Sequence, residues 1–337
     1  MEMVGRLVDE ASLIYFNARK IYQKDNRLST FYMNIRNLNI HYSFREIEEH
    51  VSKYGTEGWI VLGNDDNALY NYLVLNDSQY HVAGIFSESD VFSSINTSRM
   101  DEENLINTVR RNNYAVVIME KDLAKYEKLL SQLGNNHKFV VQDHIVGRCG
   151  LQYFDYFLPN DKEVFIDGGS LDGRTLDQFV RWCKGEYECA YAFEPNPKMI
   201  ESCKKHFCEN EKVIFSDCAL WNEQKSLVFD NRNAKWDAHV SKTGNVIVRG
   251  NSIDNMIGDN RVTFIKLDVE GSEMEALKGA QSCIQRHVPR MAISIYHKPE
   301  DMEEICKFIL KIVPDYKFAI RHYHSDAIET ILYVFKE

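Results

Sequence analysis

Three carboxylates stand close together in the carboxyl-terminal third of the chain, at Asp268, Glu270 and Glu273, directly after an apolar segment that predicts a buried strand. Such a cluster is costly unless cations or hydrogen-bond donors meet it. Ser272 can cap the helix expected to follow, and Glu273 or Glu275 can favour the positive end of that helix. This structural explanation does not account for Asp268 and Glu270. We predict that these two carboxylates face a reaction site.

A histidine, His297, follows the next predicted strand, 291–296. Open sheets bind ligands just outside the carboxyl ends of their strands, and an imidazole pKa near neutrality suits proton transfer. We therefore predict His297 as a general base. His239 is a weaker candidate, because it lies in a polar, irregular stretch with Trp236 and Asp237 where exposure on the surface is the simpler interpretation.

Glu270 is the reserve candidate for the base. Asp268, Glu270 and His297 can also be interpreted as ligands of a divalent ion that acidifies a diol. No tight ligand spacing supports this alternative, so no metal is expected.

In many folds a nucleotide site is formed by a strand, a glycine-rich loop and a helix that follow one another in the sequence. The same succession of elements is predicted from residue 163 onward. The predicted strand 163–166 is followed by a loop that contains Asp167, Gly168, Gly169, Ser170 and Thr175. A carboxylate at the strand end disfavours a pyrophosphate but suits the cationic ammonium and sulfonium groups of S-adenosyl-L-methionine. We predict that these loop residues bind this cofactor, although glycines in a turn can also serve only to permit positive φ.

The next predicted strand, 191–193, ends at Glu194 and Pro195. An acid at this strand end can accept hydrogen bonds from both ribose hydroxyls of a nucleotide, whereas the structural alternative is a solvent-facing glutamate. Pro195 fixes the turn, and Asn196 is placed to cap a helix that begins at Pro197. We predict Glu194 and Pro195 to be cofactor-binding residues.

A third strand, 213–216, precedes Asp217, Cys218 and Ala219. This strand end is expected to face the adenine, where Asp217 can accept the exocyclic amine. A turn aspartate that bonds its own backbone explains Asp217 nearly as well.

The order of these elements predicts an α/β fold. Strands that alternate with helices form parallel sheets, and here they are expected at 163–166, 191–193, 213–216, 262–267 and 291–296. Segments 316–322 and 330–335 are joined by a short polar loop and must pair antiparallel. Seven strands with a closing antiparallel hairpin are the Rossmann-like arrangement of class I methyltransferases. A strand-rich insertion at 226–257 is expected to shape the substrate pocket.

The 337 residues exceed what one hydrophobic core usually organises, so a second domain is expected. Apolar strands at 58–62, 81–86 and 114–119 alternate with helical segments at 67–75 and 123–133, which predicts a smaller Rossmann-like α/β domain.

The turn after the first of these strands holds two aspartates, Asp65 and Asp66, which would repel a pyrophosphate. A structural or oligomerisation role is therefore favoured over nucleotide binding. The expected organisation is a helical segment at 1–50, a Rossmann-like accessory domain at 51–147 and the larger domain at 148–337.

Composition excludes several classes of partner. The formal net charge of −10 argues against nucleic acid and against an anionic membrane surface. No apolar run approaches the length of a membrane span, and the first residues have no signal-peptide pattern, so a cytoplasmic protein without membrane insertion is expected. The eight cysteines include no CxxC pair and are expected to be reduced.

From residue 148 onward the chain resembles the FkbM-type S-adenosylmethionine-dependent methyltransferases. The resemblance rests on Ile265 to Glu273 (IKLDVEGSE), Leu277 to Ala280, Asp167 to Thr175, Phe193 to Pro195, Gln152 to Asp155 and Arg321 to Tyr323. Family loops often read Asp-x-Gly-Ala-Asn-x-Gly, whereas this loop has Ser170-Leu171-Asp172 in the corresponding stretch.

The resemblance implies an S-adenosylmethionine-dependent O-methyltransferase that acts on a hydroxyl of a sugar, glycan or secondary metabolite. It implies that Asp167 and Gly169 lie on the methionine side of the cofactor, that Glu194 binds the ribose, and that Asp268 and Glu270 face the site. The acceptor is then a small molecule or glycan, and a homo-oligomer is compatible with the sequence. An NAD-dependent nucleotide-sugar oxidoreductase and a non-catalytic interaction protein with a cofactor-binding fold are the alternatives.

Overall fold

The computed structural model describes residues 18, 21–22, 24, 27–36, 44–142, 145, 151–232, 238–298, 300–323 and 328–336. Contacts between Cα atoms divide these residues into two compact units, of which the first comprises residues 18–145 and the second comprises 151–323 with 328–336. Segment 1–17, and residues 146–150 between the two units, lie outside the described residues.

The amino-terminal unit is built on a four-stranded parallel sheet with the order β2-β1-β3-β4. Its strands are β1 (Gly58–Leu62), β2 (Val82–Phe86), β3 (Tyr114–Met119) and β4 (Lys138–Val141). Successive side chains of β1 enter opposite cores: Trp59 and Val61 pack on one face of the sheet, and Ile60 and Leu62 pack on the other. A sheet that is apolar on both faces must be covered by helices on both.

Within the described residues, the α-helices that the structure bounds in this unit are α2 (Leu28–Ile35), α3 (Arg45–Tyr54), α4 (Asp66–Asn76), α5 (Glu102–Asn112) and α6 (Glu127–Leu130). The helix expected at 67–75 is confirmed as α4, whereas the one expected at 123–133 is confined to the single turn of α6. The apolar spacing that suggested a longer helix is satisfied by that turn and its flanking turns, which bury Tyr126, Leu129 and Leu133. Strand β4 was not predicted.

The carboxyl-terminal unit contains a seven-stranded sheet with the order β14-β15-β13-β12-β5-β6-β7. Its strands are β5 (Glu163–Gly168), β6 (Tyr187–Phe193), β7 (Val213–Ser216), β12 (Phe264–Leu267), β13 (Arg290–Ser294), β14 (Lys317–His322) and β15 (Thr330–Phe335). Strand β15 pairs antiparallel with both β13 and β14, and the pairs from β13 to β7 are parallel. The expected mixed α/β fold with parallel sheets is confirmed.

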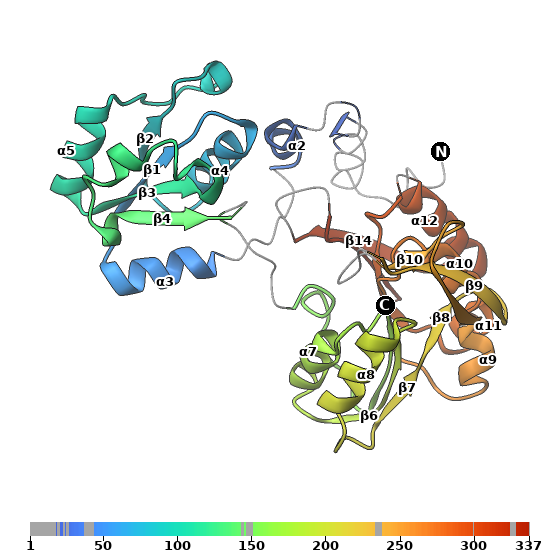
Figure 1. Cartoon of the computed structure of the whole chain (residues 1–337). Helices are drawn as coiled ribbons and strands as arrows, with labels where there is room; N and C mark the ends of the chain where they lie inside the picture. Colours follow the sequence, from blue (N-terminus) through green and yellow to red (C-terminus); the bar gives the residue numbers. More distant parts are fainter. Residues whose placement is uncertain are drawn as a thin grey trace. The chain divides into compact units, whose positions relative to one another are not determined.

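Helices connect these strands and cover the sheet: α7 (Arg174–Trp182), α8 (Pro197–His206), α9 (Ile253–Ile257), α10 (Glu273–Lys278), α11 (Gln281–His287) and α12 (Asp301–Ile312). Figure 1 shows α7 and α8 beside β6 and β7. The predicted cap of α8 is confirmed, because the Asn196 side chain accepts a hydrogen bond from the Lys198 amide and Pro197 occupies the first turn.

The insertion between β7 and β12 forms a second, four-stranded sheet with the order β10-β9-β11-β8. Its strands are β8 (Cys218–Leu220), β9 (Lys225–Asp230), β10 (His239–Val240) and β11 (Val246–Asn251). Trp236 and Asp237 lie outside the described residues. No helix among the residues that the structure describes is both long and apolar enough to cross a membrane.

Candidate active site

One pocket of the carboxyl-terminal unit lies at the carboxyl ends of its parallel strands, where Gly169, Glu194 and Asp268 follow β5, β6 and β12. The pocket encloses about 90 Å³. Its further lining comes from the strand tips and from the insertion: Leu171, Phe193, Pro195, Asn196, Cys218, Ala219, Leu220, Phe229, Ala238, Val240, Val269, Glu270 and Ser272. The sheet therefore brings three separate predicted site segments to one cavity.

The glycine loop packs against the backbone that carries Asp268. Gly169 has φ +76°, and a Cβ atom there would lie 1.9 Å from the Asp268 carbonyl oxygen. The Asp268 amide also donates to the Gly168 carbonyl over 3.1 Å. Glycine is required at position 169 because any side chain would push the two strand tips apart.

A buried ion pair holds the base of this loop. The Lys266 Nζ atom lies 3.0 Å from Asp167 Oδ1, with both side chains essentially inaccessible to solvent, and it donates to the carbonyls of Gly168 and Gly169. Burial raises the pKa of Asp167, and Lys266 offsets this only in part. Burial lowers the pKa of Lys266, but the carboxylates of Asp167, Asp268 and Glu194 together outweigh it and the Lys266 pKa is raised, so the lysine is a cation.

Glu194 turns its carboxylate toward the loop at the tip of β6. Its Oε2 accepts the Leu171 amide over 3.0 Å, and its Oε1 accepts the Asn196 amide over 2.8 Å. Burial raises the pKa of Glu194 to about 7, against the lowering effect of these two amides. Each carboxylate oxygen has a second lone pair, so the group can accept further hydrogen bonds from a ligand.

Two tyrosines orient Asp268. The Tyr153 hydroxyl donates to Asp268 Oδ2 over 2.7 Å, and the Tyr296 hydroxyl donates to Oδ1 over 3.1 Å. Burial by itself raises the pKa of Asp268, but the positive charges of Lys266 and His297 outweigh it and hold that pKa below its usual range. Asp268 is therefore a fixed carboxylate.

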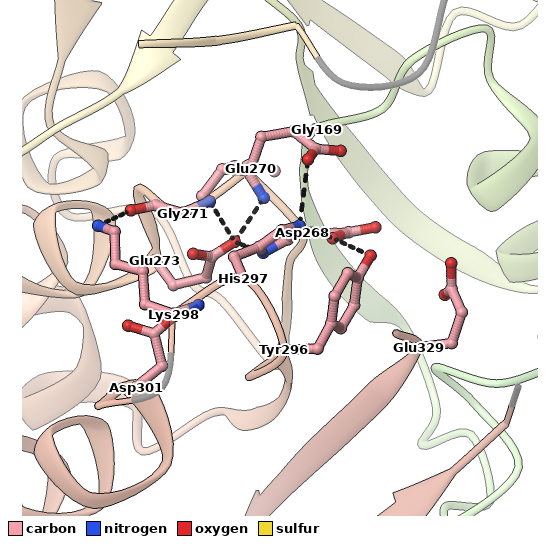
Figure 2. Close-up of polar contacts among 12 residues, drawn as sticks. Gly169, Asp268, Glu270, Gly271, Glu273, Tyr296, His297, Lys298, Asp301 and Glu329 are labelled. Carbon is pink, nitrogen blue, oxygen red and sulfur yellow. Dashed lines mark hydrogen bonds and ion pairs between the residues drawn. The ribbon is translucent and has the colours of Figure 1, made fainter. Parts of the chain in front are cut away.

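His297 is surrounded by carboxylates, as Figure 2 shows. Its Nε2 lies 3.2 Å from Glu270 Oε2 and 3.7 Å from Asp268 Oδ1, and its Nδ1 lies 3.0 Å from Glu273 Oε1. Burial lowers the pKa of His297, but the surrounding carboxylates of Glu270, Glu273 and Asp268 together outweigh this and raise it to about 11. The ring is an imidazolium near neutral pH, which does not suit the role of general base that the sequence suggested.

Glu273 organises the loop between β12 and α10. Its Oε1 accepts the Val269 amide over 2.9 Å, and its side chain is fully buried. Ser272 occupies the position before α10, but its hydroxyl makes no capping hydrogen bond. The expected serine cap is therefore wrong, and the glutamate carboxylate satisfies the loop amides instead.

Several predicted site residues do not line this pocket. Ser170 is buried, Thr175 lies in the first turn of α7, and Asp217 pairs with Arg249 beside a separate surface cavity. His239 is exposed, whereas its neighbours Ala238 and Val240 line the pocket, so strand alternation directs the imidazole to the opposite face.

Sequence reasoning missed the roles of Lys266, Tyr153 and Tyr296, and it assigned Glu273 only to helix electrostatics. A lysine inside an otherwise apolar strand was a usable signal, because lysine is almost never fully buried without a partner. The tyrosines carried no local signal, since their contacts with Asp268 join segments that are distant in the sequence.

The family match falls within the carboxyl-terminal unit. Residues 167–320 match the family model of the methyltransferase FkbM domain, so the resemblance seen in the motifs is confirmed. No match was found among curated proteins.

Among solved structures, the chain is similar to the methyltransferase FkbM from Methylobacillus flagellatus, with 17% sequence identity, a TM-score of 0.50, and coverage of 97% of this chain and 99% of that one. An rRNA methylase from Streptococcus thermophilus shares 10% identity over 53% of this chain and 89% of its own, with a TM-score of 0.35. Fibrillarin from Aeropyrum pernix shares 11% identity over 52% and 67%, with a TM-score of 0.34. At 17% identity, the likeness to the FkbM structure concerns the fold.

Proposed function

Because residues 167–320 match the methyltransferase FkbM domain, we propose that this protein transfers a methyl group from S-adenosyl-L-methionine to a hydroxyl oxygen of a sugar, glycan or secondary metabolite. One observation carries the proposal: Gly169, Glu194 and Asp268, which follow three different strands, line one pocket. The strand order of the seven-stranded sheet, with its antiparallel β15, also supports a class I methyltransferase arrangement.

The pocket residues fit the cofactor. Glu194 can accept hydrogen bonds from two ribose hydroxyls while it keeps its two amide donors. The absence of a side chain at Gly169 lets a ligand approach the backbone closely, and Cys218 and Ala219 provide a small, largely apolar wall for an adenine. When bound, S-adenosyl-L-methionine supplies an electrophilic methyl group on a cationic sulfur.

The carboxylates at the tip of β12 fit the acceptor. Asp268 is held in place by Tyr153 and Tyr296, so it can orient a hydroxyl group without rearrangement. Glu270 lines the pocket with about a third of its side chain exposed (32%), and we assign to it the proton that the acceptor hydroxyl loses. His297 is already protonated, and it positions Glu270 instead.

We expect the pocket that Gly169, Glu194 and Asp268 line to open when the cofactor binds. Its volume of about 90 Å³ is smaller than the roughly 300–1,000 Å³ of typical ligand sites. The wall formed by Phe229, Ala238 and Val240 belongs to the small sheet of the insertion, and we expect this wall to move outward when the cofactor enters.

Isothermal titration calorimetry with S-adenosylhomocysteine tests the cofactor part. We expect one site per chain, and Glu194→Ala should weaken binding by at least about 10-fold because hydrogen bonds to a charged group are lost. Glu188→Ala is the matched control, since Glu188 is an exposed acid on the same strand β6. Binding of NAD with no binding of S-adenosylhomocysteine would refute the proposal.

Transfer itself is tested with methyl-labelled cofactor and a panel of hydroxylated sugars, glycans and phenolic metabolites. We expect Glu270→Gln to lower the transfer rate about 100-fold while the affinity for S-adenosylhomocysteine stays within a few-fold of wild type. Equal rates in the variant and the wild type would remove Glu270 from the reaction. Label found on an amine and not on an oxygen would overturn the O-methyltransferase assignment.

A further inference from the structure

We propose that Asp268, Glu270 and His297 bind one divalent metal ion, and that its open positions receive two neighbouring hydroxyl oxygens of the acceptor. The ion-binding part stands on the geometry of the three side chains. The part that concerns the acceptor rests on the proposed function.

The three ligand atoms lie close enough to share one ion. One oxygen from each carboxylate and one ring nitrogen of His297 all lie within 4.8 Å of one another. His297 Nε2 is 3.2 Å from Glu270 Oε2 and 3.7 Å from Asp268 Oδ1. Two adjacent ligands that each lie about 2.1 Å from an ion, at right angles, are about 3.0 Å apart, so only small movements are needed.

The far side of the imidazole is already fixed. Glu273 Oε1 lies 3.0 Å from His297 Nδ1, which directs Nε2 toward Glu270 and Asp268 (Figure 2). Glu273 is in turn held by the Val269 amide. A carboxylate behind the histidine is the arrangement that orients metal-binding histidines and raises their basicity.

Asp268 has equivalent support, because the hydroxyls of Tyr153 and Tyr296 each donate to one of its oxygens. Both ring nitrogens of His297 are shielded from solvent, and within the described residues neither makes a hydrogen bond of good geometry despite the short distances to carboxylates. A metal ion that displaces the Nε2 proton would satisfy Nε2, the buried nitrogen that faces the two carboxylates.

The charges around the cluster also favour a cation. Asp268, Glu270 and Glu273 are three acids around one imidazole, and the nearby lysine, Lys266, is engaged by Asp167. A donor set of two carboxylates and one imidazole suits Mn²⁺, since carboxylates favour hard ions and imidazole favours transition metals. Mg²⁺ and Zn²⁺ are the expected competitors.

The position of the cluster identifies the class of acceptor. Asp268 and Glu270 line the pocket, so the coordination positions that the protein leaves open face the space for the substrate. Two adjacent open positions match the two oxygens of a vicinal diol, as found in sugars and catechols. Each carboxylate uses one oxygen for the ion, so Glu270 retains its second oxygen for the acceptor proton.

The test is an electron paramagnetic resonance titration of the full chain with Mn²⁺ and without cofactor. We expect one bound Mn²⁺ per chain, displaced by Zn²⁺ or Mg²⁺, and binding at least about 10-fold weaker in Asp268→Asn, Glu270→Gln and His297→Gln. Glu273→Gln should also weaken Mn²⁺ binding about 10-fold or more. The glutamine side-chain oxygen can still accept the hydrogen bond from the Val269 backbone N–H, but a neutral side chain holds His297 less strongly than a carboxylate does. Glu300→Gln, an exposed acid close to His297 in sequence, is the matched control and should bind as wild type does.

Failure of this inference is distinct from failure of the proposed function. If the wild-type protein binds no Mn²⁺ at concentrations up to about 1 mM, or if the Glu300→Gln variant loses as much affinity as the cluster variants do, the metal site is refuted even if S-adenosylhomocysteine binds. If Mn²⁺ binds but compounds with a single hydroxyl are methylated as fast as matched diols, the chelation of the acceptor is refuted.

Discussion

The two α/β units use the polar residues at their strand tips in opposite ways. In the amino-terminal unit, Asn64 accepts hydrogen bonds from the Ser87 hydroxyl and the Glu88 amide and donates to the Tyr126 hydroxyl. The neighbouring Asp65 caps α4 and pairs with Lys121. These groups bind the unit's own loops together, which favours the structural interpretation of this turn.

In the carboxyl-terminal unit, the acids at the tips keep capacity for a ligand. Glu194 accepts hydrogen bonds from two backbone amides and still lines a pocket. Asp268 and Glu270 line the same pocket. In both sheets the strands that carry these tips are parallel and are covered by helices, so the architecture around the tips does not distinguish the two units. The difference lies in whether the polar groups at the strand ends are satisfied internally, which is why function has to be argued from the site.

Breaking the ion pairs at the two sheets should change stability the most. Lys266→Met should lower the free energy of unfolding by about 3–5 kcal/mol, because it leaves Asp167 buried without its partner. Lys121→Met removes an exposed pair to Asp65 and should cost less than about 1 kcal/mol. Urea denaturation measures both. The double variant Asp167→Asn with Lys266→Met should recover part of the loss, and equal effects of the two single variants would contradict the comparison.

The next effect concerns the pH dependence of stability. Burial raises the pKa of Glu194 to about 7 from an ordinary 4.5, so between these values the folded protein holds a proton that the unfolded chain has released. The free energy of unfolding contributed by Glu194 therefore falls as pH rises through this window, by up to about 3 kcal/mol.

Glu194→Gln is the variant that isolates this contribution. Denaturation at about pH 4.5 and pH 8 should show wild type losing more stability than the variant on going to high pH. A wild type and a variant with the same pH dependence would show that Glu194 is ionised normally in the folded protein.

The smallest effect compares two helix caps. Asn196 caps α8 and Asp65 caps α4, and replacing either with alanine should cost about 1 kcal/mol of stability. Only Asn196→Ala should also weaken the binding of S-adenosylhomocysteine, because Asn196 lines the pocket. Weaker binding in Asp65→Ala as well would contradict this difference between the two caps.

Much of the fold could be predicted because its signals are local. Short apolar runs ending in glycine or an acid located β1, β5, β6 and β12, and the Asn196-Pro197 pair located the start of α8. The prediction failed where the local pattern was ambiguous. Strand β4 is four residues long and partly exposed, and the apolar spacing after β3 fits one helical turn as well as three.

The candidate site could be predicted as a set of residues but not as a set of roles. Asp268, Glu270 and His297 were identified from their positions after predicted strands, and the structure brings them together. Their spacing in the sequence gave no sign of shared ligands, because the carboxylates and the histidine belong to different strand ends. His297 was expected to be a base, yet three surrounding carboxylates keep it protonated.

Which residues stand at each strand tip follows from the sequence, since strand alternation, glycine turns and helix caps depend on neighbours in the chain. Which tips meet follows from the assembled sheet, as do the pairing of Lys266 with Asp167 and the place of Glu273 behind His297. Charge state and ligand geometry depend on distances of a few ångströms between segments far apart in the chain, and those distances exist only after the sheet has assembled.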